Sequence, residues 1–271
     1  MADVSGSHLT GSAPERYEQY TAPIMAPFVT ALLDAAALSP GETVLDLACG
    51  TGFVARTAAA RVGPAGHVCG TDPDAAMLQV AAAHRPRHYP DIEFTTAPAD
   101  RLPFPDATFD AVLCQQGFRS LPDPAAALHE AARVTRPAGR LAATAWAGHT
   151  RSPYLSAQYA ALARHGGQAL ADSLDAALSR PAEHLAAALR SAGFRDVTTR
   201  EITADVTLPP LPGFAPAQFS STPWGRRLAD EHGTEALTAA GRTVTDLLAG
   251  HTAPGGAVTV PFTATLATAH R

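Results

Sequence analysis

Short apolar segments alternate with helical patterns between residues 43 and 146, and this alternation limits the chain to few folds. The predicted strands are Thr43–Ala48, His67–Thr71, Ile92–Thr95, Phe109–Cys114 and Arg140–Trp146. The predicted helices between them are Val54–Val62, Asp74–His84 and Ala125–Thr135, the second with Asp74 as its N-cap. Strands that alternate with helices pair in parallel and are covered by helices on both faces. We therefore predict an α/β fold with a doubly wound, mostly parallel sheet.

The segments on either side of this region have different patterns. Residues 1–13 are rich in glycine and serine and are predicted to be disordered, whereas residues 14–38 carry apolar side chains at helical spacing. After Trp146 we predict helices at 151–178 and 181–192, a strand at 196–208, a proline-rich turn at 209–216, further helix to about 249, and a strand at 258–267. We expect residues 14–271 to form one domain, in which insertions at about 147–180 and 210–253 form a helical cap over one end of the sheet.

Composition and charge argue against several classes of protein. The net charge of −5 and the absence of a clustered basic segment disfavour a nucleic-acid partner. No run approaches the roughly 18 apolar residues of a membrane span, and no secretory leader opens the sequence, so we expect a soluble, cytoplasmic protein. The three cysteines (Cys49, Cys69 and Cys114) lack metal-ligand spacing, which predicts buried thiols and no metal. The sequence leaves open whether the protein is a monomer or a homodimer.

The stretch VLDLACGTGF, residues 44–53, joins the first predicted strand to its helix through a glycine-rich loop. Gly50 and Gly52 fit the dinucleotide-binding fingerprint, and Asp72 follows Gly50 by 22 positions (72 − 50), where an acid can accept ribose hydroxyls. S-adenosylmethionine also carries a ribose, so Asp72 does not distinguish it from a dinucleotide. Asp46 favours S-adenosylmethionine over a dinucleotide, because a carboxylate there would repel a pyrophosphate but attract the ammonium group of an amino-acid tail.

Five segments in this order resemble the seven-strand, class I S-adenosylmethionine-dependent methyltransferases, nearest to the type that methylates quinones and other small molecules. They are residues 44–52, 70–78, 99–104, 109–112 and 133–141. Ala138 stands where the family commonly has a second glycine, a departure that we expect to loosen one turn without touching the cofactor. The resemblance implies a seven-stranded sheet and S-adenosylmethionine as the cofactor.

The resemblance also implies roles for individual residues. The implied cofactor-binding residues are Tyr17, Asp46, Ala48, Gly50, Gly52, Asp72, Met77, Ala99, Asp100 and Gln115. Asp46 would serve the ammonium group and Asp72 the ribose hydroxyls. Met77 would pack on the adenine, whose amino group Asp100 would accept beside the Ala99 backbone. Ala48, Gly50, Gly52 and Gln115 would border the methionine part, and Tyr17 would reach its carboxylate from the N-terminal helix.

Methyl transfer is an in-line displacement that depends mainly on alignment, and a base is needed only when the acceptor holds its proton at neutral pH. His149, just after the fifth predicted strand, is the candidate catalytic base. Gln116 and Arg119 could hydrogen-bond an acceptor. Aromatic and proline-rich segments at 208–214 and 219–224 could line an acceptor site, or could equally be ordinary packing.

Our leading hypothesis is therefore an enzyme that transfers the methyl group of S-adenosylmethionine to an O, N or C atom of a mid-sized small molecule, such as a secondary metabolite or a quinone. One alternative is an enzyme that retains the cofactor while it cyclises or rearranges a natural product. A binding protein built on the same fold and a dinucleotide-dependent oxidoreductase are further alternatives.

Overall fold

The structure is a computed structural model that describes residues 9–86, 92–179 and 182–271. Most of the segment predicted to be disordered, residues 1–8, lies outside the described residues, as does the predicted helix start at Pro181. Ser12 accepts a hydrogen bond from the Glu15 N–H, and the Glu15 carboxylate accepts one from the Ser12 N–H, so a capping box begins the first helix at Ala13.

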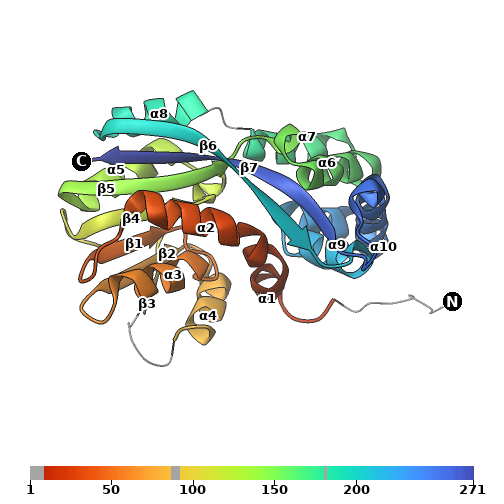
Figure 1. Ribbon diagram of the computed structural model, residues 1–271, viewed down its shortest axis with the longest axis horizontal. Helices are drawn as coiled ribbons and strands as arrows, with labels where there is room; N and C mark the ends of the chain where they lie inside the picture. The colour runs from red at the N-terminus through yellow and green to blue at the C-terminus, as the bar shows by residue number, and fades with distance from the viewer. Residues whose placement is uncertain (1–8, 87–91, 180–181) are drawn as a thin grey trace. The chain divides into compact units, whose positions relative to one another are not determined.

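Seven strands form one sheet in the order β3-β2-β1-β4-β5-β7-β6 (Figure 1). The strands are β1 (Thr43–Leu47), β2 (His67–Asp72), β3 (Ile92–Thr96), β4 (Phe109–Gln115), β5 (Thr135–Trp146), β6 (Arg195–Leu208) and β7 (Val258–His270). Neighbouring strands from β3 through β2, β1 and β4 to β5 pair in parallel, and β7 runs antiparallel to β5. Hydroxyl contacts pair Thr198 with Thr268 and Thr207 with Thr259, so β6 and β7 also run in opposite directions.

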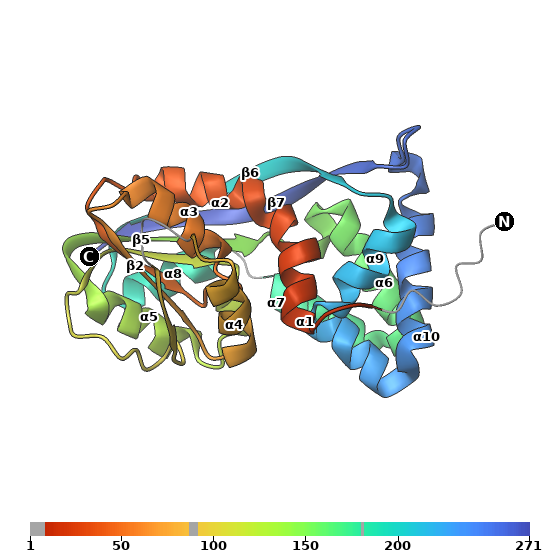
Figure 2. The same ribbon diagram turned by 90° about the horizontal axis from the view of Figure 1, so that it is seen from below.

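Along the described chain, helices lie between almost all of these strands. The helices are α1 (Ala13–Arg16), α2 (Ala22–Ala36), α3 (Phe53–Val62), α4 (Ala75–Ala83), α5 (Pro124–Val134), α6 (Pro153–Gly166), α7 (Gln168–Leu178), α8 (Ala182–Ser191), α9 (Leu211–Ser220) and α10 (Pro223–Leu247). A π-helical segment, Tyr17–Thr21, joins α1 to α2. In Figure 2, α2 and α3 lie on one side of the sheet and α5 and α8 on the other. The predicted doubly wound α/β fold is thus confirmed.

The helices begin where the sequence supplies a cap. Asp74 accepts a hydrogen bond from the Ala76 N–H at the start of α4, and Asp123 accepts one from the Ala126 N–H at the start of α5. One face of the sheet packs against α5 and α8 through fully buried side chains, among them Leu45, Val112 and Leu128. The strand order reverses between β1 and β4, and in open α/β sheets ligands bind at the carboxyl ends of the strands beside such a point.

The described chain forms two compact units. One unit contains residues 25–147, 177–202 and 263–271, and therefore most of the sheet; the other contains the N-terminal segment to residue 24, residues 148–176 and residues 203–262. Within the second unit, α10 packs against α6 and α9, and Gln218 is the centre of a buried polar network with Tyr154, Gln158 and Thr21. It remains a prediction that the insertions at about 147–180 and 210–253 act as a cap within one domain.

The prediction of a turn at residues 209–216 was wrong, because α9 starts at Leu211. Pro212 lies in the first turn of α9, where an N–H has no intrahelical partner, so the missing donor costs nothing there. Pro216 lies inside the helix, and its ring packs so closely against Gly241 of α10 that a Cβ at Gly241 would lie 2.4 Å from it. Tertiary packing therefore overrides the local signal of the prolines.

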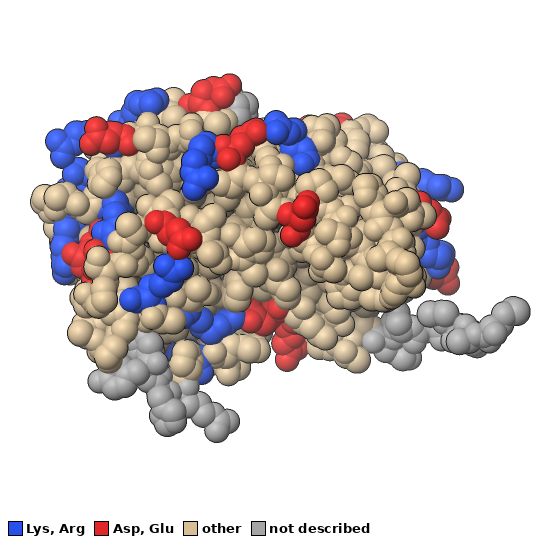
Figure 3. Space-filling view, in the orientation of Figure 1, with Lys and Arg blue, Asp and Glu red and all other residues tan. Residues whose placement is uncertain are grey.

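Figure 3 shows blue arginine and red acidic side chains side by side, so both signs of charge are present on the face drawn. None of the helices in the described part of the chain is both long and apolar enough to cross a membrane.

Candidate functional site

The loop after β1 has an unusual backbone. Ala48, Gly50 and Gly52 all have positive φ angles, of 56°, 54° and 77°. A Cβ at Gly52 would lie 2.8 Å from the Phe94 ring, so this glycine allows β3 to pack closely against the start of α3. A Cβ at Gly50 would meet nothing within 4 Å, so the loop faces open space at that residue. The two glycines thus have separate roles, one in packing and one beside a space that a ligand can enter.

Asp46 lies beneath this loop and is fully buried. Its Oδ2 accepts a 2.9 Å hydrogen bond from the Ala55 N–H, which satisfies one free donor in the first turn of α3. Burial raises the pKa of Asp46 to about 8; the Ala55 amide opposes this shift, and the nearby Asp72 carboxylate adds to it. The sequence predicts a standing negative charge at this position. In the structure, burial instead holds the carboxyl group neutral below about pH 8 until a cation compensates its charge.

Asp72, at the end of β2, ties two loops together. Its Oδ2 accepts a hydrogen bond from the Gly50 N–H and its Oδ1 accepts one from the Asp74 N–H, both at 2.9 Å. Burial raises the pKa of Asp72, and these two amides lower it. The 22-residue spacing read from the sequence therefore corresponds to a direct contact between the acid and the glycine loop.

Buried polar atoms without partners gather at the carboxyl ends of β1, β2 and β4. Among the described residues, the atoms that lack a hydrogen-bond partner include Asp46 Oδ1, Thr71 Oγ1, Gln115 Nε2 and both polar side-chain atoms of Gln116. In the sheet, Asp46 is the register partner of Leu113, and Leu47 that of Thr71, so these side chains come from adjacent strands. Each such atom costs about 1–3 kcal/mol when it is left unsatisfied. This end of the sheet therefore has the polar groups that a bound ligand would satisfy.

Gln116, at the same end of the sheet, has a strained backbone conformation. Its φ is 57°, in the left-handed region, and it stands directly between β4 and the turn that starts at Gly117. A Cβ at Gly117 would lie 2.9 Å from the Ala48 Cβ, so the loops after β1 and β4 are in close contact. Non-glycine residues in this conformation cluster at ligand sites. The side-chain oxygen of Gln115 accepts a 2.7 Å hydrogen bond from the Thr144 hydroxyl.

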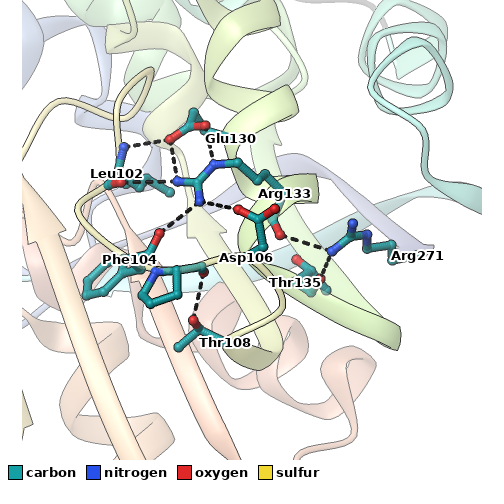
Figure 4. A network of polar contacts seen from close by, with 9 residues as sticks. Leu102, Phe104, Asp106, Thr108, Glu130, Arg133, Thr135 and Arg271 are labelled. Carbon is teal, nitrogen blue, oxygen red and sulfur yellow. Dashed lines mark hydrogen bonds and ion pairs between the residues drawn. The ribbon is translucent and has the colours of Figure 1, made fainter.

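The segment between β3 and β4 contains Ala99, which is buried, and Asp100, which is exposed. Arg133 on α5 holds the part of this segment that follows. Its guanidinium donates to the Phe104 and Leu102 carbonyls at 2.8 and 3.1 Å, and to the carboxylates of Glu130 and Asp106 (Figure 4). The Glu130 carboxylate also accepts the Leu102 N–H at 2.8 Å. Sequence reasoning missed this clamp, because the pattern shows only that Glu130 and Arg133 are three residues apart on a helix.

The remaining predicted site residues are less closely connected. Met77 lies on α4 and is half-buried. Tyr17 belongs to the π-helical segment and His149 to the turn after β5, and both lie in the second compact unit. The side chain of Arg119 lies outside the described residues. The three cysteines are buried free thiols, as predicted; burial raises the pKa of Cys69 and Cys114 to about 12.

Comparison with known proteins identifies the kind of domain that carries this site. Residues 44–139 match the family model described as a methyltransferase domain. Residues 44–139 thus form a methyltransferase domain. A solved S-adenosylmethionine-dependent methyltransferase from Aquifex aeolicus has the same fold, with a TM-score of 0.55 and 21% identity over 71% of this chain and 93% of that one.

Curated relatives of the methyltransferase domain include two quinone methyltransferases. The ubiquinone/menaquinone biosynthesis C-methyltransferase UbiE of Hahella chejuensis is 44% identical over 111 residues, which cover 40% of this chain and 45% of the relative. The 2-phytyl-1,4-naphtoquinone methyltransferase of Thermosynechococcus vestitus is 43% identical over 105 residues, 39% of this chain and 46% of the relative. The chain thus spans less than half the length of the curated relatives that it matches.

The site of the methyltransferase domain fits S-adenosylmethionine. The buried carboxyl group of Asp46, with one oxygen unpartnered, suits the ammonium group of the cofactor. The open space at Gly50 lets the backbone approach a ligand, and the Asp72 carboxylate beside it can accept ribose hydroxyls.

Proposed function

We propose that this protein transfers the methyl group of S-adenosylmethionine to a mid-sized small-molecule acceptor, a quinone or a secondary metabolite. The observation that carries the proposal is the set of unpartnered buried polar atoms around the glycine loop, in a domain whose relatives are named quinone methyltransferases. Those relatives are named for methyl transfer, and this favours transfer over a rearrangement that leaves the cofactor intact.

When bound, the cofactor supplies an electrophilic methyl group on a sulfonium. The protein has to orient this group, because alignment of the acceptor with the methyl carbon can lower the barrier by about 7–11 kcal/mol in favourable cases. In this proposal Asp46 and Asp72 fix the two ends of the cofactor that flank the sulfonium. Ala99, Asp100 and Met77 hold the adenine, and Ala48, Gly52 and Gln115 border the methionine part. Tyr17 reaches the cofactor's carboxylate.

His149 is proposed as the base that takes a proton from an acceptor hydroxyl. Its Nδ1 lies 2.6 Å from Asp175 Oδ1, and its ring stacks on Tyr159 with centroids 4.3 Å apart and planes 7° from parallel. A carboxylate beside Nδ1 requires that Nδ1 carries the hydrogen, which leaves Nε2 as the acceptor. Asp175 is then a positioning residue, and the arrangement resembles the His–Asp pairs that orient general bases elsewhere.

The cofactor site is tested with substitutions of two glycines that both have positive φ angles. Gly50 and Gly63 have φ angles of 54° and 65°, and a Cβ at either would meet nothing within 4 Å. Both substitutions should lower stability, Gly50→Ala by about 1–2 kcal/mol and Gly63→Ala by more, because the ψ of −171° at Gly63 lies in a region almost confined to glycine. Only Gly50→Ala should weaken the binding of S-adenosylmethionine measured by calorimetry, because its methyl group enters the ligand's space. Equal affinity of the two variants for S-adenosylmethionine would contradict the proposed site.

Methyl transfer is tested with S-adenosylmethionine labelled on its methyl group and a panel of reduced quinones, phenols and polyketide-like acceptors. The label should appear in an organic product, and S-adenosylhomocysteine should form in equal amount. His149→Gln should lower kcat by about 10²–10⁴-fold for hydroxyl acceptors without changing cofactor affinity. The matched control is His165→Gln, a histidine of α6 bonded to Thr243, which should have little effect. Tight cofactor binding without transfer to any acceptor class would contradict the proposed function.

A further inference from the structure

Three side chains with metal-ligating atoms meet on the sheet surface, away from the glycine loop. His67 and Cys69 are two residues apart on β2 and so point to the same face, and Glu93 of β3 is the direct register partner of Cys69. The His67 Nε2 lies 3.3 Å from the Cys69 sulfur and 3.6 Å from the Glu93 Oε2. The ligand atoms of all three residues lie within 4.8 Å of one another.

The two separations from the His67 nitrogen match those between ligands of one small metal ion. Zinc lies about 2.3 Å from a cysteine sulfur and about 2.0–2.1 Å from a histidine nitrogen or a carboxylate oxygen. At a tetrahedral angle, those bond lengths place sulfur and nitrogen about 3.5 Å apart, and nitrogen and oxygen about 3.3 Å apart. The observed values of 3.3 and 3.6 Å differ from these by only a few tenths of an ångström. A rotamer change that brings the Glu93 oxygen towards the Cys69 sulfur, which lies within 4.8 Å of it, would complete the set of three ligands.

The exposure of the three residues suits entry of an ion from solvent. The side chains of His67 and Glu93 are 48% and 60% exposed, whereas Cys69 is buried at 4%. The thiol thus forms the floor of the cluster, and the two exposed side chains form its sides. A fourth coordination position is left on the solvent side, where water can complete a tetrahedron.

We propose that His67, Cys69 and Glu93 form a binding site for a divalent zinc-type cation. A thiolate, a neutral imidazole and a carboxylate together balance a charge of +2, and binding releases the thiol proton of Cys69 to solvent. A set of one S, one N and one O ligand selects zinc or cobalt over magnesium and calcium, which require oxygen ligands. The ion bridges β2 to β3, and β3 is the edge strand of the sheet.

The test uses Co²⁺ and Zn²⁺ with the full-length protein, purified metal-free under reducing conditions. Co²⁺ should bind with a stoichiometry of one and should give a thiolate-to-metal charge-transfer band, which Zn²⁺ then displaces. Cys69→Ser should abolish the band. His67→Gln and Glu93→Gln, both at exposed positions that leave the fold intact, should weaken Zn²⁺ binding at least about 10–100-fold, the loss seen when even an outer-shell partner is removed. His129→Gln, an exposed histidine of α5, is the matched control and should leave the affinity unchanged.

A second measurement is independent of the spectrum. Zn²⁺ should raise the Tm of the wild-type protein and of His129→Gln, but not that of His67→Gln or Glu93→Gln, because an ion that binds only the folded state stabilises it. The absence of a thiolate band, or an affinity that is the same in the His67, Glu93 and His129 variants, would overturn the proposal. Saturable binding of Mg²⁺ in preference to Zn²⁺ would overturn it as well.

Discussion

Asp46→Asn should change how the stability of this protein depends on pH. The carboxyl group has a pKa of about 8 in the folded protein, against an ordinary value of 3.8. Between these two values the folded state holds a proton that the unfolded state releases. The stability contributed by this group is therefore complete below about pH 4 and is lost as the pH rises towards 8. Asparagine has no such proton, so the variant should lack this dependence.

The size of the effect follows from one proton per molecule. Each pH unit inside the window corresponds to about 1.4 kcal/mol. From pH 5 to pH 7, the variant should gain about 2.7 kcal/mol of unfolding free energy relative to the wild type. Titrating groups that do not interact with Asp46 are common to both proteins and cancel in this difference. Asparagine can still accept the Ala55 N–H through its side-chain oxygen, so the start of α3 keeps its cap.

The assay is urea unfolding of the cofactor-free protein at pH 5, 6 and 7. Asp110→Asn is the control: hydrogen bonds from the Thr43 N–H and from Arg136 hold the pKa of Asp110 below its ordinary value, although its partial burial opposes this. Its contribution is lost only as the pH falls below about 4, so the difference between Asp110→Asn and the wild type should be flat from pH 5 to pH 7. A flat difference for Asp46→Asn as well would refute the reasoning, because it would mean that Asp46 is already ionised in the folded protein.

Three other substitutions test separate parts of the structure. Ala138 has a φ of 63°, so Ala138→Gly should raise the unfolding free energy by about 0.5–1 kcal/mol in urea titrations; a decrease would contradict the backbone strain inferred from this angle. Gly52→Ala should cost more than the 1–2 kcal/mol of Gly50→Ala, because its methyl group would collide with Phe94; equal costs would contradict the packing role. Arg133→Gln should cost about 1.5–3 kcal/mol and raise the KM for S-adenosylmethionine, whereas the more exposed Arg136→Gln should cost under about 1 kcal/mol and leave KM unchanged.

The elements that sequence patterns predicted well are those in which local signals agree with the fold. Asp74 caps α4 as predicted, and the strands from 43 to 146 lie within a few residues of their predicted limits, because buried parallel strands are short apolar runs between turn residues. The strand at 140–146 was predicted too short: β5 begins at Thr135, and its ladder with β4 is irregular where the chain passes Ala138.

Features that depend on distant partners could not be predicted in this way. The helix at 211–220 was missed because its prolines signal a turn locally, while their packing is visible only in the folded unit. The Arg133 clamp joins residues about 30 positions apart. The His67–Cys69–Glu93 cluster has no recognisable spacing along the chain, since its third member is supplied by the register of the neighbouring strand. The raised pKa of Asp46 depends on complete burial, which the sequence does not show.

The central claim is that the site at the glycine loop receives a cationic amino-acid tail. The most direct measurement is calorimetric titration of the purified wild-type protein at pH 7 with S-adenosylmethionine, NAD⁺ and FAD in turn, repeated in two buffers of different ionisation enthalpy. The account predicts one site for S-adenosylmethionine, none for either dinucleotide, and a buffer-dependent enthalpy that reports a proton released from Asp46 and disappears in Asp46→Asn. Binding of NAD⁺ or FAD at this site, or no uptake of S-adenosylmethionine, would contradict it.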